Sequence, residues 1–231
     1  MEMDFALVKR RTGESSYNIM GLLHTRRKSG DTRLEPFLAE LMESWGADDD
    51  FAVSMFLHPV RGALSFGDPM PLRERLGVRK MVYADIEESD ILPFPFYIVR
   101  LTRVLVGGTP LPRPPTYLLF DSGSNYGAVG QGVMQSMLDL GVACEGGKPI
   151  VLEFESRATP GATHTQTTTL TLDPDVYCWK HTSLLIEPHS AFANIDTSES
   201  IFIMGSFFLH TFLLEFYPHL RRLGIQRVPS V

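Results

Sequence analysis

The sequence has few cysteines and lacks the long apolar runs that mark membrane proteins. Its 231 residues include two cysteines and two tryptophans, and no apolar stretch reaches the roughly 18–20 residues that a helix needs to cross a bilayer. The longest candidate, residues 201–216, is interrupted by a glycine, a serine, a histidine and a glutamate. The first fifteen residues contain no apolar core of signal-peptide length. No membrane span is therefore predicted, and the amino terminus alone would indicate the cytoplasm.

The charge and the motifs of the sequence argue against several functional classes: nucleic-acid-binding, nucleotide-binding and metal-binding proteins, and serine hydrolases. The formal net charge is −6, and the basic clusters at residues 26–28 and 221–222 are too short to form a phosphate-binding stripe. A nucleic-acid partner is therefore not predicted. The sequence has no phosphate-binding loop and no supported Ser-His-Asp pattern. Its seven histidines show no ligand spacing relative to cysteines or acids, so neither a metal nor another cofactor is expected.

The composition and periodicity predict a mainly β protein with a few short helices. The 16 prolines and 19 glycines are spread along the chain, which is typical of short strands joined by turns. Residues 67–80 are interpreted as a connection, and the prolines of residues 110–115 exclude that stretch from a sheet interior. Helices are expected at 34–45, closed by Gly46, and at 131–140, with Val133, Met134, Met137 and Leu138 on one face. Strands are expected at 51–57, 63–66, 96–106, 117–120, 163–174 and 201–204.

One short stretch, LLFDSGSNYGAVG at residues 118–130, raises a question of function. It places a single carboxylate, Asp121, directly after an apolar strand and surrounds it with small residues. Aspartate, serine and glycine are also the ordinary residues of polar turns. Taken alone, the stretch is compatible with either a catalytic acid or a strand that ends in a turn.

The order of short motifs around Asp121 resembles the pepsin-like family of aspartic endopeptidases. LLFDSGS resembles the family's active-site signature, in which an apolar run precedes Asp-Thr/Ser-Gly-Thr/Ser. Downstream, the apolar segment that leads to Gly205 resembles the paired segment of the same lobe. The remaining segments that carry the resemblance are YIVRLTRVLVGGTPLP (97–112), LTLDPDVYCW (170–179) and, nearer the amino terminus, YNIMGLL (17–23), LEPFLAELMESW (34–45), FAVSMFL (51–57) and GALSFGD (62–68).

The resemblance implies a fold and a division into two parts. Residues 81–231 would form the family's carboxy-terminal lobe, a mainly β structure of the double-psi β-barrel type. Residues 1–80 would be the end of an incomplete amino-terminal lobe. The substrate-covering flap and the second catalytic aspartate would belong to the part of that lobe that this sequence does not contain.

The resemblance also assigns roles to individual residues. Asp121 would be one catalytic acid, and Ser122, Gly123, Ser124 and Gly205 would form the supporting loops. The Gly123 N–H would point toward the carboxylate, Ser122 would bond across to the opposite lobe, and Ser124 would bond the outer carboxylate oxygen. The sequence departs from the family after the signature, at residues 125–127, and it has Ser206 where many relatives have an aspartate.

The two cysteines fall where the family's carboxy-terminal lobe carries a disulfide. The resemblance therefore implies a Cys144–Cys178 bridge, against the alternative of two buried free thiols. A disulfide indicates an oxidising compartment. The expected location is then the secretory pathway, the extracellular space or a lysosome- or vacuole-like compartment, in conflict with the missing signal peptide.

Catalysis in this family needs two aspartates, and the sequence contains a single Asp-Ser/Thr-Gly triplet. Asp196 lacks the glycine and the preceding apolar strand, so it is interpreted as a loop residue. Three explanations remain open: a fragment whose other lobe comes from the same precursor or a separate chain, a non-catalytic binding or inhibitor protein, or a symmetric dimer. The first predicts an endopeptidase that cleaves polypeptides. The partial first lobe would obstruct the dimer contact.

Overall fold

The computed structural model describes residues 37–58, 60–87, 97–180, 182–188 and 200–229, and it divides the chain into units 1–46 and 47–231. In the first unit, helix α1 (Phe37–Trp45) confirms the helix predicted there, and Leu38, Leu41 and Met42 are buried. Trp45, which its spacing assigned to the apolar face, is 51% exposed. It is the last helical residue, directly before Gly46, whose left-handed backbone (φ +59°) ends the helix.

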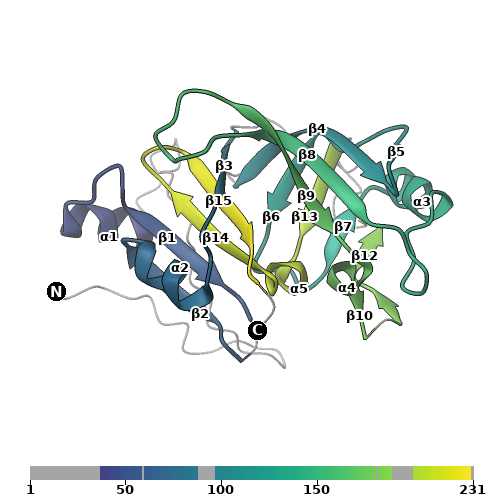
Figure 1. The fold of residues 1–231 in the computed structure, drawn as a ribbon, viewed down its shortest axis with the longest axis horizontal. Coiled ribbons are helices and arrows are strands. Elements are labelled where there is room, and N and C mark those ends of the chain that lie inside the picture. Colours follow the sequence, from purple (N-terminus) through teal and green to yellow (C-terminus); the bar gives the residue numbers. More distant parts are fainter. Residues whose placement is uncertain (1–36, 59, 88–96, 181, 189–199, 230–231) are drawn as a thin grey trace, which may run out of the picture. The chain divides into compact units, whose positions relative to one another are not determined.

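The second unit confirms the prediction of a mainly β structure with few and short helices (Figure 1). Its helices are α2 (Met70–Leu76), α3 (Gln131–Asp139), α4 (Pro174–Tyr177) and α5 (Ser206–Leu209). Its strands are β1 (Ala52–Phe56), β2 (Ala63–Gly67), β3 (Val82–Asp85), β4 (Ile98–Val106), β5 (Thr109–Pro110), β6 (Tyr117–Phe120), β7 (Gly127–Val129), β8 (Ile150–Ser156), β9 (Gln166–Leu172), β10 (Cys178–Trp179), β11 (Ser183–Leu184), β12 (Ile186–Pro188), β13 (Ile201–Met204), β14 (Phe212–Tyr217) and β15 (Arg222–Arg227). None of the helices in the described part of the chain is long and apolar enough to span a membrane.

An antiparallel five-stranded sheet joins the early strands of the second unit to the carboxy-terminal hairpin. Its order is β2-β1-β14-β15-β3, so β14 and β15, yellow in Figure 1, lie between β1 and β3. The pairing of β1 with β2 confirms the hairpin predicted at residues 51–66. The boundary predicted between residues 80 and 81 stays a prediction, and strands from both sides of it are paired in this one sheet.

Residues 70–76 correct the prediction that 67–80 is only a connection. They form α2, which begins at two prolines that a helix accepts in its first turn. Leu72 and Leu76, four residues apart, face inward, and Gly77 ends the helix with φ +67°. The arginines and prolines of this segment obscured a short helical period. The buried residues around α2 and the five-stranded sheet form one core: Ala52, Phe56, Leu72, Leu76, Val78, Met81, Tyr83, Leu213, Tyr217 and Val228.

A buried ion pair fixes α2 to this sheet. Glu215, on β14, is fully buried, and it accepts hydrogen bonds from Arg73 Nε at 2.6 Å and Nη2 at 2.5 Å. The Arg73 guanidinium also donates to the hydroxyls of Tyr83 and Tyr217. Burial by itself lowers the pKa of Arg73, but the hydrogen bond and charge of Glu215 raise it overall. The Arg73 guanidinium therefore keeps its charge and binds the Glu215 carboxyl group through two hydrogen bonds.

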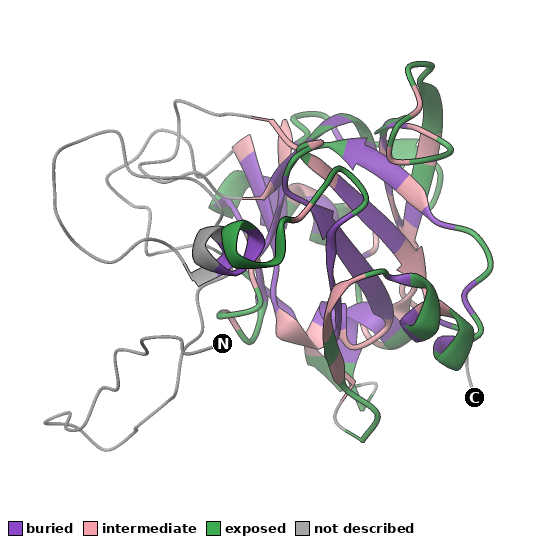
Figure 2. Ribbon diagram, turned by 90° about the vertical axis from the view of Figure 1, so that its left-hand side faces the viewer, coloured by how far each residue is buried: buried purple, intermediate pink, exposed green. Residues whose placement is uncertain are grey.

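The eight-stranded sheet carries the Asp121 segment. Its path is β12-β7-β13-β6-β4-β8-β9, and β5 pairs with β4 across the predicted Gly107-Gly108 turn. Most strand residues are buried while the connections are exposed (Figure 2). β9 lies at the end of the path, and its threonine-rich first half is largely exposed, as the sequence predicted. A short helix follows it.

The disulfide between Cys144 and Cys178 confirms the predicted bridge. It joins the segment after α3 to β10 and spans 34 residues of sequence. Beside it, the buried Tyr177 donates to the carbonyls of Ala143 and Lys148. Within α3, Val133, Met134 and Met137 are buried as predicted, whereas Leu138 is 42% exposed because it lies in the last turn at the margin of the apolar stripe.

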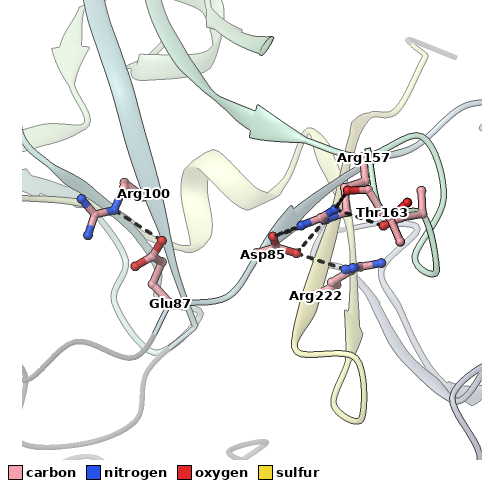
Figure 3. A network of polar contacts seen from close by, with 7 residues as sticks. Asp85, Glu87, Arg100, Arg157, Thr163 and Arg222 are labelled. Carbon is pink, nitrogen blue, oxygen red and sulfur yellow. Dashed lines mark hydrogen bonds and ion pairs between the residues drawn. The ribbon is translucent and has the colours of Figure 1, made fainter. Parts of the chain in front are cut away.

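A second polar network connects the two large sheets at their surface (Figure 3). Asp85, at the end of β3, accepts hydrogen bonds from Arg157, which follows β8, and from Arg222, at the start of β15. The backbones of Tyr83 and Arg157 exchange two hydrogen bonds at the same place. The hydrogen bond from Arg157, together with Arg222, lowers the pKa of the Asp85 carboxyl.

Removing one partner of the buried pair should strongly destabilise the protein. In Arg73→Met the Glu215 carboxylate stays buried without its counter-charge, which costs about 3–5 kcal/mol of unfolding free energy. Urea denaturation monitored by circular dichroism measures the loss. Arg75→Met, an exposed arginine of the same helix, should change the unfolding free energy by less than about 0.5 kcal/mol. Equal effects of the two substitutions would contradict this account.

The Asp85 network should make stability depend on pH in the acidic range. The pKa of Asp85 is lower in the folded state than its ordinary 3.8, so its stabilisation is present above that value and is lost as the pH falls through the folded-state pKa. Asp85→Asn should therefore be less stable than the parent at pH 7, and the difference should shrink below about pH 4. Denaturation series from pH 7 to 2.5 measure it, with the exposed Glu74→Gln as control. A difference that does not change with pH would exclude the charge as its origin.

Candidate active site around Asp121

Two parallel strands bring Asp121 and Gly205 to the same edge of the sheet. β6 and β13 pair in register, with Phe120 opposite Met204, so the residues that follow them emerge side by side. The backbone N–H of Asp121 donates to the carbonyl of Met204 at 3.0 Å. The apolar residues of both strands are almost all buried, which holds the two strand ends in place. Asp121 is thus attached to the Gly205 loop through its own backbone.

The turn that follows β6 directs a backbone donor at the acid. The Gly123 N–H donates to Asp121 Oδ1 at 3.0 Å, as the resemblance implied, and the Ser124 N–H donates to the Asp121 carbonyl at 3.2 Å. Asp121 is half-buried, whereas Ser122 and Gly123 are exposed. The carboxylate is therefore oriented by a bond on one oxygen while its surroundings remain open to solvent.

The expected bond from Ser124 to the carboxylate is not the one observed. The Ser124 hydroxyl donates instead to the carbonyl of Tyr126 at 3.0 Å. The turn brings the Tyr126 carbonyl close to the Ser124 hydroxyl, so the hydrogen bond between them lies within the loop. The Ser124 hydroxyl therefore stabilises the loop that carries the acid and is directed at the Tyr126 carbonyl, not at the Asp121 carboxylate.

Gly205 lies in close contact with the turn that follows Asp121. The next two backbone N–H groups, of Ser206 and Phe207, donate to the carbonyls of Ser124 at 2.6 Å and Asn125 at 3.2 Å. A Cβ atom on Gly205 would lie 2.1 Å from the Tyr126 carbonyl oxygen, which is far inside van der Waals contact. Only glycine permits this approach of the two loops. The part that Gly205 plays in catalysis stays a prediction.

A set of aromatic side chains beside these loops was not predicted from the sequence. Phe207, on α5, has its ring 5.6 Å from the rings of both Tyr126 and Trp179. Tyr126 is 43% exposed and Trp179 is 48% exposed. Phe207 also contacts the ring of His210, whose pKa is lowered by burial and by the charge of His58. These residues come from three separate segments, and only the tertiary structure brings them together.

Several residues considered in the sequence cannot be placed at the site. Asp196, His24, His181 and His189 lie outside the described residues. Within the described ranges, no group of three or more His, Cys, Asp or Glu side chains is arranged to hold a metal ion.

Comparison with protein-family models gave no match, and none of the curated proteins matched the sequence.

Adding a methyl group at Gly205 should disturb the candidate site. Gly205→Ala places a Cβ against the Tyr126 carbonyl, so the two loops must separate, at a cost of about 1–3 kcal/mol in unfolding free energy. Denaturation measures the cost, and backbone NMR shifts of residues 121–127 report the displacement. Gly161→Ala, where a Cβ would meet nothing within 4 Å, should leave both unchanged. Unshifted signals in Gly205→Ala would show that the loops are not in this contact.

Proposed function

We propose that this chain is part of a pepsin-like aspartic endopeptidase and that Asp121 is one of its two catalytic acids. The observation that carries the proposal is the junction of β6 and β13. There, an acid held by a backbone bond to the neighbouring strand receives an N–H from the glycine two residues ahead. An ordinary polar turn needs neither the parallel partner strand nor the tight contact with Gly205.

The strand pairing supports the more specific proposal of a double-psi lobe. β13 runs parallel to β6 on one side and antiparallel to β7 on the other, so the Asp121 turn leads from β6 across to the far side of β13. β12 then pairs with β7 in parallel. This crossing of a loop over a neighbouring strand is what the proposed lobe requires. The sequence order of the motifs supports the same assignment.

The proposed chemistry is hydrolysis of a peptide bond by a water molecule held between two carboxylates. Two carboxyl groups that hold the same water molecule lie too close together for both to be ionised, so they share one proton. This is established for aspartic proteases as a class. The ionised carboxylate takes a proton from the water, and the protonated one donates to the scissile carbonyl. In this chain, the Gly123 N–H stabilises one oxygen of Asp121 and fixes its orientation.

The second acid and the rest of the substrate cleft would come from an amino-terminal lobe, in the same precursor or on a separate chain. The substrate would be a polypeptide. The Cys144–Cys178 disulfide favours an oxidising compartment such as the secretory pathway, the extracellular space or a lysosome- or vacuole-like organelle.

A non-catalytic binding or inhibitor protein on the same scaffold is the second candidate. The observation that favours it is the Ser124 hydroxyl, which bonds the Tyr126 carbonyl and leaves the outer carboxylate oxygen without that donor. The exposed Tyr126 and Trp179 would then serve as a protein-contact surface.

Peptide cleavage at acidic pH separates the two candidates. The two-lobe protein, either a precursor that contains both lobes or this chain combined with the lobe that carries the second acid, is incubated with a peptide library between pH 3 and 7, and products are identified by mass spectrometry. We expect cleavage with an acidic optimum that a statine-type inhibitor blocks. Asp121→Asn should reduce the rate at least about 100-fold, whereas Asp139→Asn, an exposed acid on α3, should not change it.

Two outcomes would count against the endopeptidase. Cleavage that survives in Asp121→Asn would place the activity elsewhere. A wild-type two-lobe protein that cleaves nothing over the whole pH range would favour the non-catalytic candidate.

A further inference from the structure

The connection between β8 and β9 has a composition that the proposed function does not use. Residues 158–165 read ATPGATHT, and together with β9 they contain threonines at positions 159, 163, 165, 167, 168, 169 and 171. Threonine with neighbouring proline and small residues is the composition of O-glycosylated segments. In the structure this connection lies outside the sheet ladder, as a turn followed by irregular backbone before β9 begins at Gln166.

The backbone of the connection is held in place from the inside. The turn is closed by a bond from the Ala162 N–H to the Thr159 carbonyl at 3.2 Å. Arg157 donates to the carbonyls of Ala162 and Thr163, and the same guanidinium binds Asp85 (Figure 3). The anchoring therefore uses main-chain oxygens alone and leaves the threonine side chains out of the network.

The threonine side chains of the connection face solvent. Thr159, Thr163 and Thr165 are exposed, and within the described ranges their hydroxyls make no hydrogen bond. By contrast, Thr168 of β9 is turned inward and bonds the Ser156 hydroxyl at 2.5 Å. A substituent on the three loop hydroxyls would thus break no contact of the folded protein.

We propose that this connection, through Thr159, Thr163 and Thr165, is an acceptor site for O-linked glycosylation. A glycosyltransferase must reach the acceptor hydroxyls, which an exposed connection outside the sheet permits and a strand paired with its neighbour restricts. The disulfide indicates a compartment where sugar transferases act and cytosolic protein kinases do not. The site is independent of the catalytic role proposed for Asp121.

The modification is a glycosyl transfer from a nucleotide-activated N-acetylhexosamine. The threonine Oγ forms a bond to the anomeric carbon, and the bond from that carbon to the diphosphate oxygen breaks. The nucleoside diphosphate leaves with the electron pair, and the hydroxyl proton passes to a base of the transferase. No oxidant or reductant is needed.

The test is site mapping on the protein produced in the secretory pathway of cultured animal cells. Intact mass and electron-transfer fragmentation should show one to three N-acetylhexosamine-initiated glycans on the peptide that contains residues 158–165. The triple variant Thr159→Ala, Thr163→Ala, Thr165→Ala should lose them. Thr167→Ala, Thr169→Ala, which removes exposed threonines of the paired strand β9, should retain them.

Glycan mapping of the wild-type protein tests the proposal even if a variant is not secreted. An unmodified 158–165 peptide, glycans confined to β9, or phosphate in place of sugar would each overturn the proposal. Peptide cleavage is measured in parallel on the two-lobe protein produced in the same cells, because glycosylation with no cleavage would count against the endopeptidase and leave this site intact.

Discussion

The parallel pairing of β6 with β13 is the constraint on which the candidate site depends. Parallel strands end at the same edge of a sheet, so a residue after one strand meets the residue after the other. Here the two are Asp121 and Gly205, joined by the bond from the Asp121 N–H to the Met204 carbonyl. The position of the acid is set by two buried, paired strands. A single turn or a single serine hydroxyl would restrain it less.

The sheets that support this junction are tied together by charged groups at two depths. Arg73 and Glu215 form a pair inside the five-stranded sheet's core, where an unpartnered carboxylate would be costly. Asp85 lies at the surface, 49% exposed, between Arg157 and Arg222, where solvent screens each contact. Loss of one partner of the Arg73–Glu215 pair would therefore lower the stability of the protein. The Asp85 network links β3 to the end of β8 and makes the stability depend on pH.

The sequence predicted part of the local structure and little of the long-range contacts, and strands β3, β8 and β15 were not predicted. Apolar runs that end in a turn predicted β6 and β13, and the disulfide was predicted because the resemblance to pepsin-like proteins implied it. The helix at 70–76 was missed because prolines and arginines outnumber its two inward leucines. The bond from Ser124 to Tyr126 could not be foreseen, since it depends on how one turn closes.

Contacts between segments distant in sequence could not be predicted either, because they depend on tertiary packing and not on local sequence patterns. Arg73 and Glu215 are separated by 142 residues, and no local period links them. Phe207 contacts Tyr126 and Trp179 only after the turn at Asp121 has packed against Gly205. A short motif thus specifies where an acid stands on its strand, while its surroundings are specified by the fold. The proposed catalysis would require a second carboxylate facing Asp121, and that requirement belongs to the surroundings that the fold specifies.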